Sequence, residues 1–168
     1  HAEFQEVDRD EADGVEVVYW IGCAAAFDER AQKIARSVVQ VLRHAGVRFG
    51  ILGAAETSTG ECVRRLGNEM VFQALAATLV ETLNGVSVTR IVTCDPHAFN
   101  SLKNEYPEFG GRWEVLHHTQ LLARLLADGR LRVAPTLERV IFHEPCYLGR
   151  HNGEFEAPRA LLRALAKD

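Results

Sequence analysis

Short runs of apolar residues alternate with segments of helical periodicity over most of this chain. Runs rich in β-branched and aromatic residues, typical of strands, lie at 15–21, 49–52, 90–93, 113–116 and 140–142. Helical spacing of apolar residues lies at 28–45, 68–83, 98–106, 119–126 and 157–166. Strands that alternate with helices indicate βαβ units. We therefore predict an α/β fold, with a mostly parallel five-stranded sheet and helices on both faces, in Rossmann- or flavodoxin-like layers.

The two ends of the chain depart from this alternation. Residues 1–14 carry six acidic side chains, and we expect them to form a flexible leader. Residues 15–168 are expected to form a single domain, long enough to bury a sizeable core. VIFHEPC at 140–146 has the layout of VVYWIGC at 17–23, namely an apolar run, a turn residue and then cysteine. The end of the chain, about 140–168, is therefore predicted to resemble the start of a second repeat.

Charge and composition exclude several classes of function. The formal net charge is −4 and the pI about 6.0, so the chain lacks the basic character of proteins that bind nucleic acid or an anionic membrane. Its apolar runs are far shorter than the ~18 residues of a membrane span. Its four cysteines are scattered, which does not resemble the disulfide framework of a secreted protein. We expect a reduced, cytoplasmic setting, with any membrane association coming from parts outside this chain.

Chemically reactive side chains follow each of the predicted strands. In a parallel sheet the carboxyl ends of the strands meet at one edge, where such folds place their sites. The groups that follow successive strands are Cys23, then Ser58 and Thr59, then Cys94, Asp95 and His97, then His117 and His118, and finally His143 and Cys146. We therefore expect the functional site at this edge of the sheet.

The cysteines among these residues have more than one interpretation. Cys23 is either a thiolate ligand or nucleophile near a helix N-terminus, or a small buried residue at a strand end. Cys146 lies close to His143, and the two form a Cys/His dyad, part of a metal site, or only a turn. No third triad member accompanies Cys146 at a recognisable spacing, which disfavours the dyad. Cys62 opens a predicted helix and is taken as structural.

Asp95 and the neighbouring histidines also have two interpretations each. Asp95 precedes Pro96, and it either caps the next helix or binds a metal together with His97. His117 and His118 are expected on one strand, where they point to opposite faces, so that at most one of them faces a given site. The glycines match neither Gly-rich phosphate-loop pattern, which gives nucleotide binding little support.

Five stretches of the sequence resemble one known family. They are GCAAAFDERAQKIARSVVQVLRHAGVRFGILG, ETSTGECVRRLGNEMVFQ, IVTCDPHAFNSLKNEYPEFGG, VLHHTQLL and HEPCYLGRHN. Together they resemble the cysteine-rich CCG domain of heterodisulfide reductase-like iron–sulfur oxidoreductases. Similar members include membrane-associated reductases that pass electrons from electron-transfer flavoprotein to menaquinone. The resemblance covers nearly the whole predicted domain.

The resemblance implies an iron–sulfur cluster bound by cysteines at the strand ends, because soft thiolates suit iron. The family's cluster positions fall on Cys23, Ser58, Asp95, Ala98 and Cys146. Only the first and the last of these are cysteines in this chain. Cys94 is displaced by one residue from a family position, so its side chain points away if the strand continues. We therefore expect no family-type [4Fe–4S] cluster here.

The resemblance implies two alternative functions, and a zinc site is a further possibility for the second of them. The first is a domain of an iron–sulfur oxidoreductase in an electron-transfer chain, with a degenerate cluster site. Its partner would be an electron-transfer flavoprotein or another component of a membrane-associated complex. The alternative is a metal-free scaffold or interaction domain derived from the same fold. A zinc site is considered because a mixed set of ligands suits zinc better than a cluster. Its candidate ligands are Cys23, Cys94, Asp95, His97 and Cys146.

Overall fold

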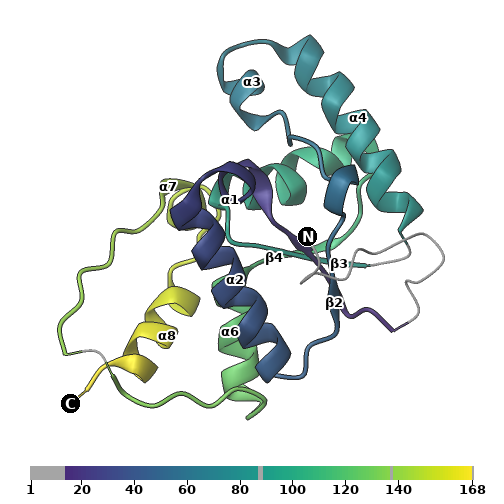
Figure 1. Cartoon of the computed structure of the whole chain (residues 1–168). Helices are drawn as coiled ribbons and strands as arrows, with labels where there is room; N and C mark the ends of the chain where they lie inside the picture. Colours follow the sequence, from purple (N-terminus) through teal and green to yellow (C-terminus); the bar gives the residue numbers. More distant parts are fainter. Residues whose placement is uncertain (1–13, 87–88, 137, 168) are drawn as a thin grey trace.

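The computed structural model describes residues 14–86, 89–136 and 138–167, around a central parallel sheet. Its four strands are β1 (Val17–Trp20), β2 (Phe49–Gly50), β3 (Arg90–Thr93) and β4 (Glu114–His117). They lie in the order β2-β1-β3-β4 and form the sheet at the centre of Figure 1. The register pairs Val18 with Gly50 on one side and with Ile91 on the other, and Ile91 pairs in turn with Val115. The predicted α/β fold with a parallel sheet is confirmed.

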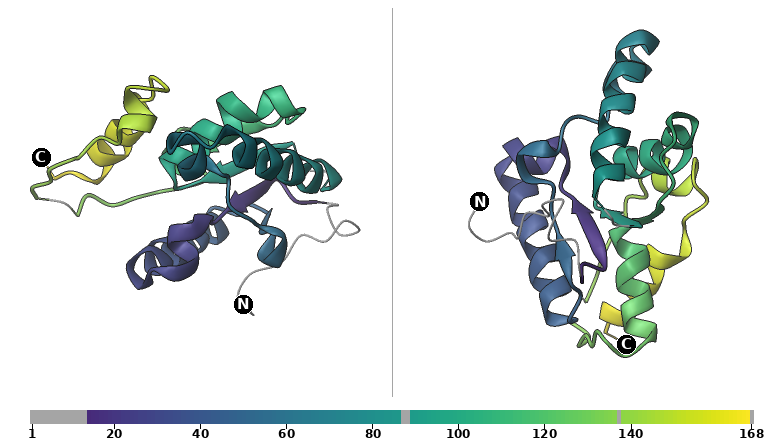
Figure 2. Two further views of the ribbon diagram at one scale, coloured as in Figure 1. Left: turned by 90° about the horizontal axis from the view of Figure 1, so that it is seen from above. Right: turned by 90° about the vertical axis from the view of Figure 1, so that its right-hand side faces the viewer.

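Helices cover both faces of this sheet, as predicted (Figure 2). The helical segments on the two faces are α2 (Glu29–His44), α4 (Glu69–Gly85), α5 (Pro96–Asn100), η2 (Ser101–Glu105), η3 (Tyr106–Phe109) and α6 (His118–Ala127). α2 and α6 pack on the face that carries Val17 and Tyr19 of β1. α4 and the run from α5 to η3 pack on the other face, which carries Val18 and Trp20. The alternation of side chains along β1 thus divides the core into two layers.

Capping side chains explain where the two longest helices begin. Asp28 accepts a hydrogen bond from the backbone N–H of Ala31 at 2.8 Å, and α2 begins at the next residue. Asn68 likewise accepts from the N–H of Val71 at 3.2 Å, directly before α4. Phe72 of α4 is completely buried against the sheet. Local capping and the burial of one apolar face together define these helices.

The predicted helix 98–106 is part of a longer helical run. α5 begins earlier, at Pro96, and η2 continues it as a π-helix. Pro107 does not stop the run, because it occupies the first turn of the 3-10 helix η3, where its missing N–H has no intrahelical partner to lose. Gly110, in the left-handed conformation, ends the run instead.

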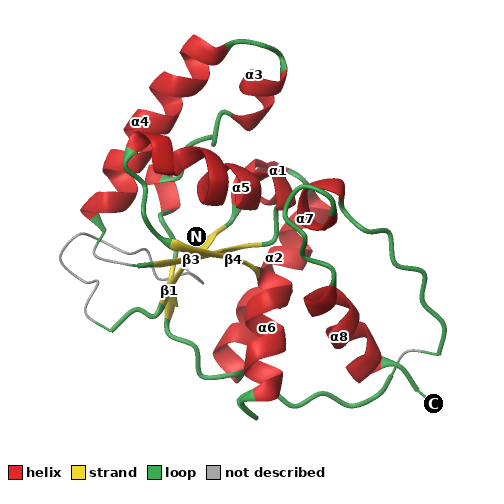
Figure 3. Ribbon diagram, turned by 180° about the vertical axis from the view of Figure 1, so that it is seen from behind, coloured by secondary structure: helices red, strands yellow, loops and turns green. Residues whose placement is uncertain are grey.

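The predicted fifth strand, 140–142, is wrong. These residues are extended but pair with no other strand that the structure describes, and Ile141 is fully exposed. They belong to a connection that runs outside the sheet toward α7 (Cys146–Gly149) and α8 (Glu156–Leu165), as Figure 3 shows from behind. α8 packs on α6, which directs the connection away from the edge of β4. The apolar run therefore has no strand beside it with which to form a ladder.

The remaining short elements are α1 (Gly22–Phe27), η1 (Gly53–Ala55) and α3 (Glu61–Arg65). All three follow the carboxyl ends of β1 and β2. Of the predicted leader, 1–13 lies outside the described residues. Within the described part of the chain, no helix has both the length and the apolar character needed to cross a membrane.

Candidate functional site

The start of α1 contacts the segments that follow β2 and β3. Gly22 has a φ of +82°, a left-handed conformation that favours glycine, and a side chain at this position would meet the Asp95 carboxylate at 3.6 Å. The Glu56 carboxylate, from the loop after β2, accepts hydrogen bonds from the N–H groups of Ile21 and Gly22 at 3.1 and 2.6 Å. Burial raises the pKa of Glu56, and these two hydrogen bonds partly oppose the shift. Cys23 is therefore presented beside Glu56 and Asp95.

Asp95 acts as the N-cap of α5. Its Oδ1 accepts a hydrogen bond from the backbone N–H of His97 at 2.8 Å, and its own N–H donates to Thr93 Oγ1 at 3.1 Å. The capping interpretation is confirmed. A role of Asp95 or His97 as a metal ligand stays a prediction.

Cys94 belongs to the core on the α2 side of the sheet. Its thiol lies 3.3 Å from the Tyr19 hydroxyl, and it packs against the apolar cluster beneath α2 and α6. Burial raises the pKa of Cys94 to about 11, so the thiol is protonated near neutral pH. Cys94 also borders a cavity of about 260 Å³ lined mainly by small and apolar side chains of α1 and α2. This orientation leaves Cys94 poorly suited to act as a thiolate ligand.

Two other family cluster positions carry no thiol and have local structural roles. Ser58 is exposed, and its hydroxyl accepts a hydrogen bond from the N–H of Gly60 at 3.2 Å. Ala98 is buried in the core on the α4 side. Neither residue offers a soft ligand for iron.

Three of the four cysteines, Cys23, Cys62 and Cys146, are exposed free thiols. Burial raises the pKa of Cys62, and the negative charges of Glu61, Cys23 and Asp95 raise it further. Cys62 therefore lies within electrostatic range of Cys23 and Asp95. The sequence alone assigned Cys62 a structural role, because Cys62 opens a predicted helix.

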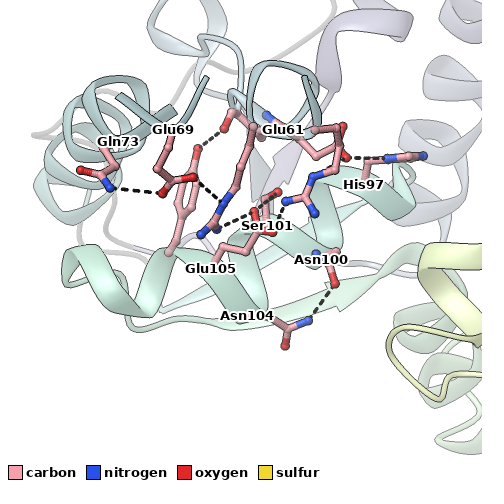
Figure 4. A network of polar contacts seen from close by, with 12 residues as sticks. Glu61, Glu69, Gln73, His97, Asn100, Ser101, Asn104 and Glu105 are labelled. Atoms are coloured by element: carbon pink, nitrogen blue, oxygen red, sulfur yellow. Dashed lines mark hydrogen bonds and ion pairs between the residues drawn. The ribbon is translucent and has the colours of Figure 1, made fainter. Parts of the chain in front are cut away.

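A network of polar contacts fixes α3 against α5 and η2 (Figure 4). The nearly buried Glu61 lies 3.1 Å from Nδ1 of His97 and 3.5 Å from Nε of Arg65. Glu105 of η2 pairs with Arg65 at 2.5 Å and with Arg64 at 3.5 Å, and it accepts a hydrogen bond from Ser101 at 2.9 Å. These contacts hold the first turn of α3, which carries Cys62, beside the first turn of α5.

The segment around α7 docks on α5 through rings and amides. The ring of Tyr147 lies 4.2 Å from that of His97 and stacks on His151 at 4.4 Å. Asn152 donates hydrogen bonds to Asn100 Oδ1 at 3.0 Å and to the Tyr147 carbonyl at 2.6 Å. This packing brings Cys146, at the start of α7, to the same end of the sheet as α5.

The Cys/His dyad of Cys146 and His143, which the sequence already disfavours, finds no support in the geometry. Both residues are exposed, and within the described ranges their side chains form no hydrogen bond with each other. The adjacent Glu144 instead pairs with Arg159 at 2.6 Å. A catalytic dyad therefore has no preformed base.

His117 and His118 do not point to opposite faces, which corrects the prediction. β4 ends at His117 and α6 begins at His118, so the strand alternation does not extend to the second ring. The two rings lie 4.3 Å apart. His117 also contacts Thr119 Oγ1 at 2.7 Å and the Cys94 carbonyl at 3.3 Å. Burial lowers the pKa of His117 to about 4, while burial and the charge of His117 lower that of His118 to about 3.

The residues at this edge do not fit a four-thiolate cluster. Of the family positions, Cys23 and Cys146 offer exposed thiols and the other three have no sulfur. The adjacent Cys94 is half-buried and protonated. Among the residues that the structure describes, no three His, Cys, Asp or Glu side chains are grouped so as to hold a metal ion. Exposed thiols and carboxylates therefore lie around the carboxyl ends of the strands, where Asp95 caps α5.

Sequence comparisons find several similar curated proteins. The chain is 48% identical over 151 residues to the "Probable iron-sulfur-binding oxidoreductase FadF" of Bacillus subtilis, covering 89% of this chain and 21% of the relative. It is 46% identical over 159 residues to the "Probable membrane-anchored ferredoxin" of Chromohalobacter salexigens, covering 91% of this chain and 24% of the relative. It is 43% identical over 155 residues to the "EtfAB:quinone oxidoreductase" of Syntrophomonas wolfei, covering 90% and 22%.

The chain thus spans less than a quarter of the length of these curated relatives. No solved structure matches it. A family model described as a cysteine-rich domain, CCG, matches residues 17–103, from β1 to the middle of η2. The chain belongs to the cysteine-rich CCG domain family.

Proposed function

We propose that this chain is a domain of an iron–sulfur oxidoreductase that works in an electron-transfer chain, and that it binds no family-type cluster itself. The relatives named as iron–sulfur-binding oxidoreductase, ferredoxin and quinone oxidoreductase support the first part. The side chains at the family cluster positions support the second part. The main observation behind the second part is that Asp95 caps α5 and Ala98 is buried in the core.

The proposed role of the domain is to position or dock a redox partner. The relative named EtfAB:quinone oxidoreductase supports an electron-transfer flavoprotein as that partner, and the one named as membrane-anchored supports a complex at the membrane. Titration calorimetry of this chain with the flavoprotein tests the partner. Saturable binding supports the proposal, and the absence of heat at millimolar concentrations contradicts it for the chain on its own.

Iron and acid-labile sulfide analysis of the chain, purified without oxygen, tests the missing cluster. We expect no stoichiometric iron or sulfide and no visible absorption. About four irons per chain, the content of a [4Fe–4S] cluster, would refute the proposal.

A gain-of-function variant provides the matched positive control. Ser58→Cys, Asp95→Cys and Ala98→Cys together place thiols at all five positions that the family uses. We expect this triple variant to take up iron and sulfide under reconstitution conditions in which the unaltered chain remains colourless. If the variant also stays colourless, the assignment of these positions to a cluster pocket is wrong.

A further inference from the structure

Cys62 adds a second exposed thiol to the sheet edge that carries Cys23, at a position that is not one of the family cluster positions. Both thiols are free and exposed. They come from segments that lie far apart in sequence, after different strands of the sheet. Cys23 is the second residue of α1, and Cys62 is the second residue of α3.

Three contacts bring these two helices to one place. The Glu56 carboxylate ties the loop that leads to α3 to the first residue of α1, at 2.6 Å from the Gly22 nitrogen. Asp95 lies against the same glycine from the end of β3. Glu61, directly before Cys62, lies 3.1 Å from His97 in the helix that Asp95 caps. α1, α3 and α5 therefore begin around a common point.

The buried carboxylate of Glu61 is a second observation at this point. Glu61 is 5% exposed, and its Oε1 receives no hydrogen bond of good geometry from the described residues, although His97 and Arg65 lie nearby. The negative charges of Cys23 and Asp95 also raise the pKa of Cys62, which supports the placement that the three contacts give. Among the cysteines of the described ranges, Cys146 has no such influence, and Cys94 is turned into the core.

We infer that Cys23 and Cys62 form a dithiol–disulfide couple, a two-electron redox site at the sheet edge that carries the family cluster positions. This inference rests on the proposed function, because a bound cluster would occupy Cys23. The co-reactant is a disulfide, of low molecular weight or on another protein, and the reaction is thiol–disulfide exchange.

The exchange balances in two steps. The thiolate of one cysteine attacks the external disulfide, which forms a mixed disulfide and releases one external thiolate. The thiolate of the second cysteine then attacks the protein sulfur of the mixed disulfide and releases the other external thiolate. The two cysteines lose two electrons and two protons, and the external disulfide is reduced to two thiols.

Thiol counting on the full 168-residue chain tests this inference, with oxidised glutathione as the probe. Iron is measured first on the same sample, so that a bound cluster, which would refute the proposed function, is recognised separately. We expect the number of thiols that react in the native state to fall from the three exposed cysteines to none, because Cys23 and Cys62 become linked and Cys146, without a partner, keeps one bound glutathione. Peptide mapping should find Cys23 linked to Cys62.

Single variants make the assignment specific. In Cys62→Ser and in Cys23→Ser the remaining partner should keep a bound glutathione, because no second thiol displaces it. Cys146→Ser is the matched control at an exposed cysteine, and it should still form the internal link. The inference is overturned if glutathione stays on Cys23 and Cys62 of the iron-free, unaltered chain, or if the internal link joins either of them to Cys146.

Discussion

The pair of histidines at the end of β4 should make the fold sensitive to acid. His117 is 3% exposed, and its pKa is lowered from 6.5 to about 4, chiefly by burial. In the unfolded chain the imidazole binds a proton near pH 6.5, whereas the folded chain excludes the proton until a lower pH. The unfolded state therefore binds more protons in this interval, and the free energy of unfolding must fall as the pH falls.

The size of this effect follows from the two pKa values. One pH unit of difference is worth about 1.4 kcal/mol, so the interval from 6.5 to about 4 corresponds to about 3 kcal/mol for His117. The stabilisation is complete above pH 6.5 and is lost progressively down to about pH 4. His118 acts in the same direction, but its ring lies 4.3 Å from that of His117, so the two effects do not simply add.

Urea denaturation at a series of pH values between about 7.5 and about 4.5 measures this loss. His117→Asn should flatten the dependence, because asparagine does not titrate and can still approach Thr119 Oγ1. The raised pKa of Glu56 changes the free energy of unfolding in the opposite direction as the pH varies. This contribution is the same in both proteins, so a comparison of their two slopes removes it. His44→Asn, at an exposed position on α2, is the control and should keep the original slope. Equal slopes for His117→Asn and the unaltered chain would refute the reasoning.

Other features of the site and core give further predictions. Glu61→Gln should speed the alkylation of Cys62 by iodoacetamide at neutral pH, because removal of the carboxylate lowers the pKa of that thiol; an unchanged rate would contradict the assigned contact. Asp95→Ala should lower the free energy of unfolding by about 1 kcal/mol through loss of the N-cap, and Asp95→Asn should retain most of it. Phe72→Ala should cost about 3–5 kcal/mol in urea denaturation, whereas the exposed Met70→Ala on the same helix should cost little.

The sequence predicts the layers of this fold well because most of its signals are local. Apolar runs locate β1, β3 and β4, and capping side chains such as Asp28 locate helix starts. The fifth strand failed because a strand needs a partner, and pairing depends on the path of the chain. The run at 140–142 has the right composition, but the packing of α8 on α6 leaves it outside the sheet.

The site was predictable in its place but only partly in its contacts. Strand alternation anticipated that Cys94 turns away, and the Asp95-Pro96 pair anticipated a helix cap. The neighbourhood of Cys62 and Cys23 was not predictable, since it depends on Glu61 reaching His97 across the space between α3 and α5. No spacing rule connects residues that tertiary contacts alone bring together. The same limit applies to the histidines, because the boundary between β4 and α6 decides how their rings lie.

The contacts at the strand edge also explain how the fold can keep this pocket without a cluster. If thiolate–iron bonds were needed to hold the loops, their loss would leave polar backbone groups and helix ends without partners. Instead, Glu56 satisfies the start of α1, Asp95 satisfies the start of α5, and Ser58 closes the turn before α3. The ion pairs of Glu105 fix the other side of α3. The loops are thus held by side chains independent of iron, which leaves the Cys23 thiol free for exchange with an external disulfide.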